Sequence, residues 1–177
     1  ANGTYSFNGG VTLDGGNAGI NIMGGDVSLL LPKLSITHTG TNPVVDIRNH
    51  SRGTVNLRGL PVGGVLTLVD GQRMRFDNAD GTYDFNGQVT LNGHNAGIDI
   101  LGGSSGTFTF PDTDITHSGS GSAVNINDHS GGTVTFGSGS TFDATGGTGL
   151  QFSNADGVYD FNGEVTLNGG DAGIDIL

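Results

Sequence analysis

The chain has 177 residues, of which 35 are glycine, and it contains no cysteine or tryptophan. The absence of cysteine excludes a disulfide scaffold and a thiolate site. Seventeen acidic residues against six basic ones give a formal net charge of −11, which argues against nucleic-acid binding. No stretch is long and apolar enough to predict a membrane span.

The sequence repeats itself at two periods. A segment that begins at Gly81 recurs as a near copy at Gly3 and again at Gly157. This long period predicts internal repeats at 1–78, 79–154 and, incompletely, 155–177. Within them, shorter coils start at Gly3, Asp26, Gly53, Gly81, Gly106, Gly132 and Gly157, at spacings of 23 to 28 residues. A period of this length indicates a solenoid, in which each repeat packs on its neighbours.

Each coil is expected to hold three short strands, each marked by two inward residues that are two positions apart and, except for His38 and His117, apolar. The first strands centre on Tyr5/Phe7, Val27/Leu29, Val55/Leu57, Tyr83/Phe85, Phe108/Phe110, Val134/Phe136 and Tyr159/Phe161. The second strands centre on Val11/Leu13, Ile36/His38, Leu66/Leu68, Val89/Leu91, Ile115/His117, Phe142/Ala144 and Val165/Leu167. The third strands centre on Ile20/Ile22, Val45/Ile47, Met74/Phe76, Ile98/Ile100, Val124/Ile126, Leu150/Phe152 and Ile174/Ile176.

Alternation with a period of two places one side of each strand inward and the other outward. Three strands per coil of ~25 residues, joined by turns rich in glycine and asparagine, predict an all-β, three-faced parallel β-helix, or β-solenoid, of about seven coils. The usual preference for right-handed crossovers predicts a right-handed coil. A sandwich or a propeller would need hairpins, and neither explains why the same residue types return at the same position in coil after coil. We therefore expect residues 1–177 to form a single solenoid.

Histidine occupies two inward positions. His38 and His117 are expected to take the place of Leu13 and Leu91 in neighbouring coils and to hydrogen-bond to the backbone. They lie three coils apart, about 14 Å, which is too far for shared metal ligation. The other three histidines, His50, His94 and His129, are expected in solvated turns.

No catalytic, cofactor-binding or metal-binding residue is predicted. Residues 169–175 resemble the Gly-Gly-x-Gly-x-Asp repeat of calcium-binding β-rolls, but with one residue too many. A weakly held surface calcium ion at residues 77–80 or 154–156 is the one cofactor that the oxygen-rich turns suggest. Polysaccharide-cleaving β-helices need acidic clusters with basic residues in a cleft built by long loops, whereas the turns here are short. We therefore expect the chain not to be an enzyme.

Threonine is the outward residue at the centre of the second strand in six of the seven coils. A flat threonine array on a solenoid resembles the ice-binding proteins, which need two parallel columns. The flanking positions vary, so strand propensity explains this column better.

The charges are distributed unevenly along the chain. Residues 1–80 carry six acidic and six basic residues, whereas residues 81–177 carry eleven acidic residues and no basic one. This asymmetry predicts an electrostatic contribution to association that salt would weaken.

Two apolar turns, at residues 30–34 and 60–62, fall among the basic residues and are expected to stack at one corner. An exposed apolar patch with a charged rim is typical of a partner surface. The alternative is that these turns fold back and pack locally. The candidate interface consists of Leu31, Lys33, Arg58, Leu60, Val62, Arg73 and Arg75.

The segments 106–110 (Gly-Thr-Phe-Thr-Phe) and 132–136 (Gly-Thr-Val-Thr-Phe), with the Gly-Ile-Asp-Ile endings, resemble right-handed parallel β-helix repeats. Such repeats occur in large secreted bacterial adhesins and autotransporter-like surface proteins. The resemblance implies an extracellular or cell-surface location and a role as a stalk, fibre or adhesive surface.

We expect a structural repeat module of an extracellular fibre or filament. Neither terminus has a polar cap, so head-to-tail coil stacking and lateral contacts are the expected forms of self-association. The alternative is an adhesin segment that binds a glycan or a cell surface. A polysaccharide-active enzyme is a remote third reading.

Overall fold

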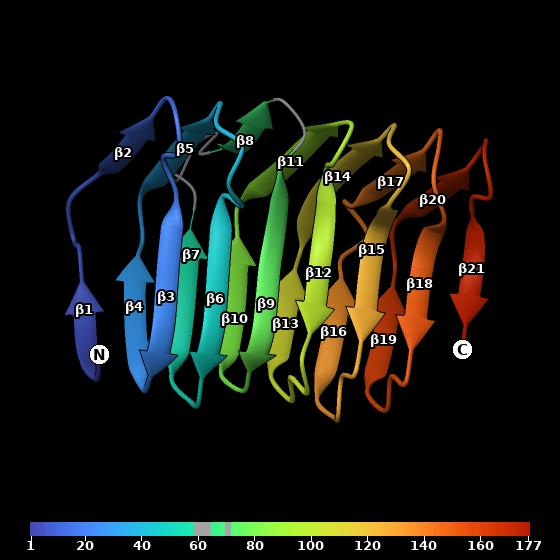
Figure 1. Cartoon of the computed structure of the whole chain (residues 1–177). Helices are drawn as coiled ribbons and strands as arrows, with labels where there is room; N and C mark the ends of the chain where they lie inside the picture. Colours follow the sequence, from blue (N-terminus) through green and yellow to red (C-terminus); the bar gives the residue numbers. More distant parts are fainter. Residues whose placement is uncertain (59–64, 70–71) are drawn as a thin grey trace.

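The computed structural model describes residues 1–58, 65–69 and 72–177, with residues 65–69 described as a backbone strand only. These residues form three parallel sheets of seven strands each and contain no helix (Figure 1). The predicted all-β parallel solenoid is therefore confirmed. Figure 1 shows each coil passing up the back, over the top and down the front while the chain advances from left to right, which makes the coil right-handed.

Each coil contributes one strand to each of the three sheets. Sheet A contains β1 (Gly3–Ser6), β4 (Val27–Leu31), β7 (Thr54–Arg58), β10 (Thr82–Asn86), β13 (Thr107–Phe110), β16 (Thr133–Phe136) and β19 (Val158–Phe161). Sheet B contains β2 (Val11–Asp14), β5 (Leu34–His38), β8 (Val65–Val69), β11 (Gln88–Gly93), β14 (Asp112–His117), β17 (Thr141–Ala144) and β20 (Glu164–Leu167). Sheet C contains β3 (Ile20–Gly25), β6 (Val45–His50), β9 (Arg73–Ala79), β12 (Gly97–Leu101), β15 (Ser122–Asn127), β18 (Gly149–Ser153) and β21 (Gly173–Ile176).

The register of sheet C agrees with the prediction in every coil. The inward pairs stack without a shift from Ile20/Ile22 at one end to Ile174/Ile176 at the other. Those in the middle of the rod are completely buried, because strands from neighbouring coils cover them on both sides. The apolar column that the alternation predicted is therefore present.

Sheets A and B depart from the predicted register by two residues in four strand pairs. Tyr5 lies opposite Leu29, and the other pairs found are Leu29/Leu31 opposite Val55/Leu57, Leu34/Ile36 opposite Val11/Leu13, and Thr113/Ile115 opposite Val89/Leu91. The predicted partners were Val27/Leu29, Ile36/His38 and Ile115/His117. Since side chains alternate with a period of two, a two-residue shift leaves the same side of each strand facing inward. The fold is therefore unaffected, although the stacked partners change.

The histidines differ from the prediction in part. His117 lies opposite Gly93 rather than Leu91, and its Nδ1 is 2.7 Å from the Ala96 carbonyl oxygen. His38 makes the equivalent bond to the Ala18 carbonyl at 2.6 Å, so both are core histidines bonded to the backbone, as predicted. His50 and His129 were expected to be solvated, but both are completely buried.

Aromatic side chains form a continuous ladder along the inner face of sheet A. The ring centroids of Phe85 and Phe110 lie 4.9 Å apart with planes 10° apart, and Phe110 stacks on Phe136 at 5.0 Å. From sheet C, the edge of Phe76 packs against both Phe85 and Phe110. Stacked and edge-to-face pairs add about 0.5–1.5 kcal/mol each beyond area burial, so this ladder fixes the distance between the two sheets.

Replacing Phe110 by alanine is expected to lower the free energy of unfolding by about 3–5 kcal/mol, because the ring is fully buried between two others. The measurement is urea unfolding followed by circular dichroism. Thr109→Ala, on the outward side of the same strand, is the control and should change stability by less than about 0.5 kcal/mol. Equal effects of the two substitutions would contradict the assigned ladder.

Candidate interaction surfaces

The first coil leaves an apolar end face uncovered. On β1, Tyr5 and the nearby Phe7 are about half exposed, although both belong to the inward set. With Ile22, Val27 and Leu29 they line a hollow of about 300 Å³. One edge of each strand in this coil has no neighbouring strand, so its N–H and C=O groups are open to pairing. We call this surface the N-terminal end face.

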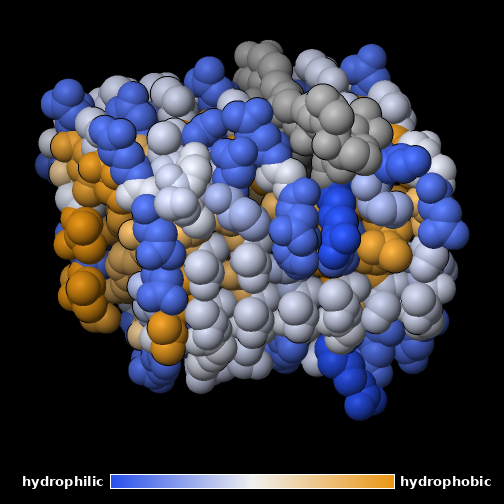
Figure 2. Space-filling model, turned by 180° about the vertical axis from the view of Figure 1, so that it is seen from behind, coloured by the Kyte–Doolittle hydropathy of each residue, from blue (hydrophilic) through white to orange (hydrophobic). Residues whose placement is uncertain are grey.

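The last coil leaves the opposite face uncovered. Ile174 is 60% exposed and Ile176 is 81% exposed, although the equivalent residues of inner coils are completely buried. With Tyr159, Phe161 and Val165 they line an almost wholly apolar hollow of about 360 Å³. We call this surface the C-terminal end face; its exposed residues form part of the orange region at the left of Figure 2.

The two end faces present the same residues in the same order. Six inward positions are identical in the two coils: Tyr5/Tyr159, Phe7/Phe161, Val11/Val165, Leu13/Leu167, Ile20/Ile174 and Ile22/Ile176. The strands that carry them also occupy equivalent positions in the three sheets. The two end faces therefore carry the same six inward side chains at equivalent positions of the three sheets.

A row of hydroxyl side chains crosses the outer face of sheet A. The register places Thr4, Ser28, Thr54, Thr82, Thr107 and Thr133 in one column, which ends at Val158. Figure 2, which views the molecule from behind, shows a row of pale side chains along the lower half of this face. The threonine column predicted on the second strand is interrupted instead, since Thr90 lies opposite Asp114. The regular hydroxyl surface therefore belongs to sheet A rather than to sheet B.

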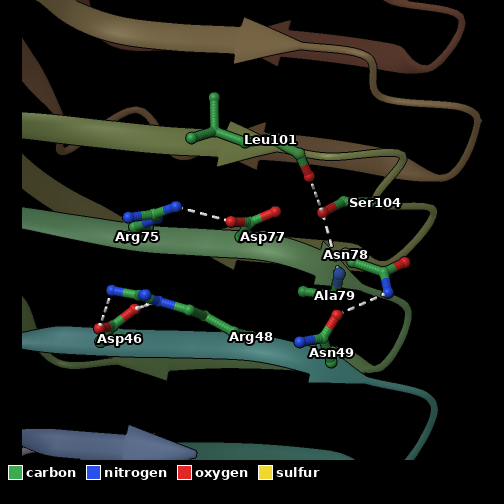
Figure 3. Close-up of polar contacts among 9 residues, drawn as sticks. All are labelled: Asp46, Arg48, Asn49, Arg75, Asp77, Asn78, Ala79, Leu101 and Ser104. Atoms are coloured by element: carbon green, nitrogen blue, oxygen red, sulfur yellow. Dashed lines mark hydrogen bonds and ion pairs between the residues drawn. The ribbon is translucent and has the colours of Figure 1, made fainter. Parts of the chain in front are cut away.

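Charged side chains form a ladder on the outer face of sheet C. Asp46, Arg75 and Asp99 lie opposite one another in three successive strands. Arg48 pairs with Asp46 and Arg75 pairs with Asp77, each at 2.6 Å (Figure 3). These groups are only partly exposed, and opposite charges on neighbouring strands stabilise a sheet. The ladder therefore neutralises much of the positive charge of the first half of the chain.

Arg73 is held more firmly than the other arginines. Its guanidinium binds both carboxylate oxygens of Asp99 and also donates to the Ser122 carbonyl at 3.0 Å. The guanidinium lies over Gly97, where a Cβ atom would be 3.1 Å from Arg73 Cζ. Glycine at this position therefore leaves room for a bidentate pair between two coils and for a further hydrogen bond to a third.

The described residues of the predicted corner interface do not gather at one place. Leu31 ends β4 with only 3% of its surface exposed and belongs to the core, which supports local packing at this turn. Lys33 is exposed in the next turn, and Arg58 is exposed at the end of β7, where it donates to Asn56. Arg73 and Arg75 belong to the ladder of sheet C. The predicted residues Leu60 and Val62 lie outside the described part of the chain.

The sequence does carry a signal for this ladder. Alternate residues of the third strands carry charges of both signs: Asp46 and Arg48 in one coil, and Arg73, Arg75 and Asp77 in the next. These are the outward positions of strands whose inward residues were predicted correctly. Comparing outward residues between neighbouring coils would have revealed the pairing.

The turns considered for calcium make an ion pair and hydrogen bonds within the protein. Asp77 is paired with Arg75, and Asp80 accepts hydrogen bonds from both the amide and the hydroxyl of Ser105. Asn154 donates to Asp128. Across the described ranges, no three histidine or acidic side chains gather closely enough to form a metal site.

Within residues 1–58, 65–69 and 72–177, no helix could cross a membrane. Comparison of the chain with protein-family models, curated proteins and solved structures finds no match. The chain is thus a parallel β-solenoid whose family is not assigned by similarity.

Proposed function

We propose that this chain is a structural module of an extracellular fibre, extended by stacking the C-terminal end face of one copy on the N-terminal end face of the next. The observation that supports this proposal is the identity of six inward residues at the two ends. Stacking would continue all three sheets with the same kind of residue above and below each position.

The apolar surface of the end faces is large enough to drive such an association. Burying a large apolar side chain contributes about 1.5–3 kcal/mol. Twelve such side chains, six on each end face, would lose part of their exposure. A third of the burial free energy summed over the twelve side chains exceeds the lower end of the ~4–15 kcal/mol that association costs in lost translational and rotational freedom.

Electrostatic attraction contributes little to this stacking. Four of the six basic residues already form ion pairs with acidic residues of the same chain: Arg48, Arg52, Arg73 and Arg75. The coil of residues 157–177 carries four carboxylates, and the first coil carries none but Asp14. Salt screens repulsion between acidic groups and strengthens apolar association. We therefore expect salt to strengthen the stacking, whereas the sequence alone predicted that salt would weaken association.

The 177-residue chain is expected to form linear oligomers that grow with protein concentration and persist at high salt. Ile176→Asp should abolish them, because it places a charge in the centre of the C-terminal end face. Sedimentation velocity and electron microscopy measure the outcome.

The control is Val158→Asp, which adds the same charge to the same coil but on the outer face of sheet A, where Val158 is 57% exposed. It should assemble like the unmodified chain. Monomers at all concentrations, or equal loss in both variants, would contradict end-face stacking.

A second candidate function, glycan binding, is supported by the hydroxyl column of sheet A. Hydroxyl groups at a regular spacing of ~4.8 Å offer a straight row of hydrogen-bond donors and acceptors to a polymer that carries hydroxyls itself. The adjacent column contains Asn56 and Asp84, which lie opposite each other. The Asn56 amide donates a hydrogen bond to the Asp84 carboxylate at 3.1 Å. This arrangement would suit an extended, uncharged polysaccharide.

If sheet A binds a polysaccharide, Thr107→Lys should weaken retention on insoluble cellulose or chitin by about tenfold or more, which corresponds to ~1.4 kcal/mol. Thr116→Lys is the matched control, since Thr116 is an exposed strand threonine on sheet B. Equal retention of the two variants, or no retention of the unmodified chain on either polymer, would remove this second candidate.

A further inference from the structure

Asparagine is followed directly by glycine at six positions, all in or beside the three coils that begin at Gly3, Gly81 and Gly157. The six asparagines are Asn2, Asn8, Asn86, Asn92, Asn162 and Asn168. In such a pair the glycine nitrogen can attack the side-chain amide carbon of the asparagine. Glycine favours this attack, because it has no side chain to obstruct the approach and it reaches backbone conformations that other residues avoid.

The attack leads to deamidation, for which water is the only co-reactant. The glycine nitrogen loses its proton and bonds to the asparagine Cγ, which expels ammonia and closes a succinimide ring. Water then opens the ring at either carbonyl, which gives aspartate or isoaspartate. One amide and one water thus become one carboxylic acid and one ammonia. Hydrogen bonds that hold the asparagine or the glycine slow the reaction, because they must break first.

Two of the six asparagines occupy the same place in their coils as Asn8, and both are held. The Asn86 side-chain amide donates to the Asp84 carboxylate at 2.7 Å, and the amide of the following glycine donates to the Phe85 carbonyl at 2.8 Å. Asn162 donates to the Phe136 carbonyl from its backbone at 3.0 Å and from its side chain at 3.1 Å.

The three asparagines at other places are held as well. Asn2 Oδ1 accepts the Asp26 amide at 2.9 Å, and the following glycine donates to the Asp26 carbonyl at 3.2 Å. Asn92 lies within β11, which pairs with a strand on each side. The glycine after Asn168 packs on Thr145, whose carbonyl oxygen would lie 2.6 Å from a Cβ atom on that glycine.

Asn8 is the exception. It lies in the segment between β1 and β2, which Figure 1 shows at the left edge of the rod with a neighbouring coil on one side only. The amides of residues 8–10 and the side chain of Asn8 make no hydrogen bond to any described residue. All three residues are exposed, and a Cβ atom on either glycine would meet nothing within 4 Å. The Gly9 nitrogen is therefore free to reach the Asn8 side chain.

We propose that Asn8 is a site of spontaneous deamidation, which limits the time for which a free N-terminal end face can accept another copy of the chain. Either product places a carboxylate in the first coil. Isoaspartate also lengthens the backbone between Phe7 and Val11, which both belong to this end face. The limit on stacking rests on the proposed function, whereas the modification itself does not.

Deamidation would oppose stacking, and stacking would protect Asn8. By equivalence of the two coils, Asn8 would lie opposite Asn162 of the preceding copy, between Asp160 and Glu164. A new carboxylate at residue 8 would therefore face two like charges. The backbone amide of Asn162 donates to the coil that precedes it. The bond that Asn8 lacks is thus the one that a preceding copy would supply, so only a free end face is subject to this reaction.

Peptide mass spectrometry of the unmodified chain, kept dilute at mildly alkaline pH, would test the site. Conversion of amide to acid at Asn8 should be about tenfold faster or more than at Asn86 or Asn162, which hydrogen bonds hold. The three share the sequence Phe-Asn-Gly, so they should react at similar rates in the urea-unfolded chain. Similar rates in the folded chain, or a faster reaction at another Asn-Gly pair, would overturn the proposal.

Asn8→Gln is the matched variant for the effect on stacking, because glutamine keeps the amide but must close a larger ring that forms more slowly. Aged samples of the unmodified chain should lose the ability to form oligomers in sedimentation velocity, whereas aged Asn8→Gln samples should keep it. Loss in both, or in neither although Asn8 has reacted, would contradict the limit on stacking. A fresh chain that never assembles would contradict the proposed function and this limit together, while the peptide measurement still decides the modification.

Discussion

Parallel stacking in register is the constraint on which the rest of this structure depends. In each of the three sheets a strand bonds to the strand one coil before it and one coil after it, so its backbone groups are satisfied only by neighbouring coils. The same register places like residues on top of one another and produces the aromatic ladder of Phe85, Phe110 and Phe136. An inner coil is complete because it has two neighbours. A terminal coil has one, and the proposed fibre supplies the missing neighbour.

The same constraint organises the charges. Because Asp46, Arg75 and Asp99 lie opposite one another, sheet C alternates acid and base from coil to coil. Beyond Asp99 this outward column continues with Asn125 and Gln151, without another base. The acidic surplus of residues 81–177 therefore reflects the absence of ladder partners in the later coils. The basic half of the sequence, which suggested a free positive surface, is largely neutralised by its own neighbours.

The sequence predicts well which side chains face inward, and predicts less well which residues of neighbouring strands lie opposite one another. Alternation depends only on odd and even positions, so the inward residues, the three sheets and the register of sheet C could be identified without coordinates. A shift of two residues preserves that alternation, which is why β4 was aligned wrongly and why the sequence left Leu31 open between an interface corner and local packing, of which the structure shows the second. His129 was placed in solvent because its space exists only where Gly157 lacks a side chain. The contact between His129 and Gly157 joins residues of different coils, so the sequence of one coil does not predict it.

The bonds from His50 to Tyr83 and from His129 to Tyr159 each skip a coil, since they join the second coil to the fourth and the fifth to the seventh. Inserting or deleting one coil would move the histidine away from its tyrosine and leave a ring facing the wrong corner. Inserting or deleting three coils would preserve every such pair. The repeat that keeps these pairs intact is therefore a block of three coils, and duplicating that block would lengthen the rod without separating a histidine from its tyrosine.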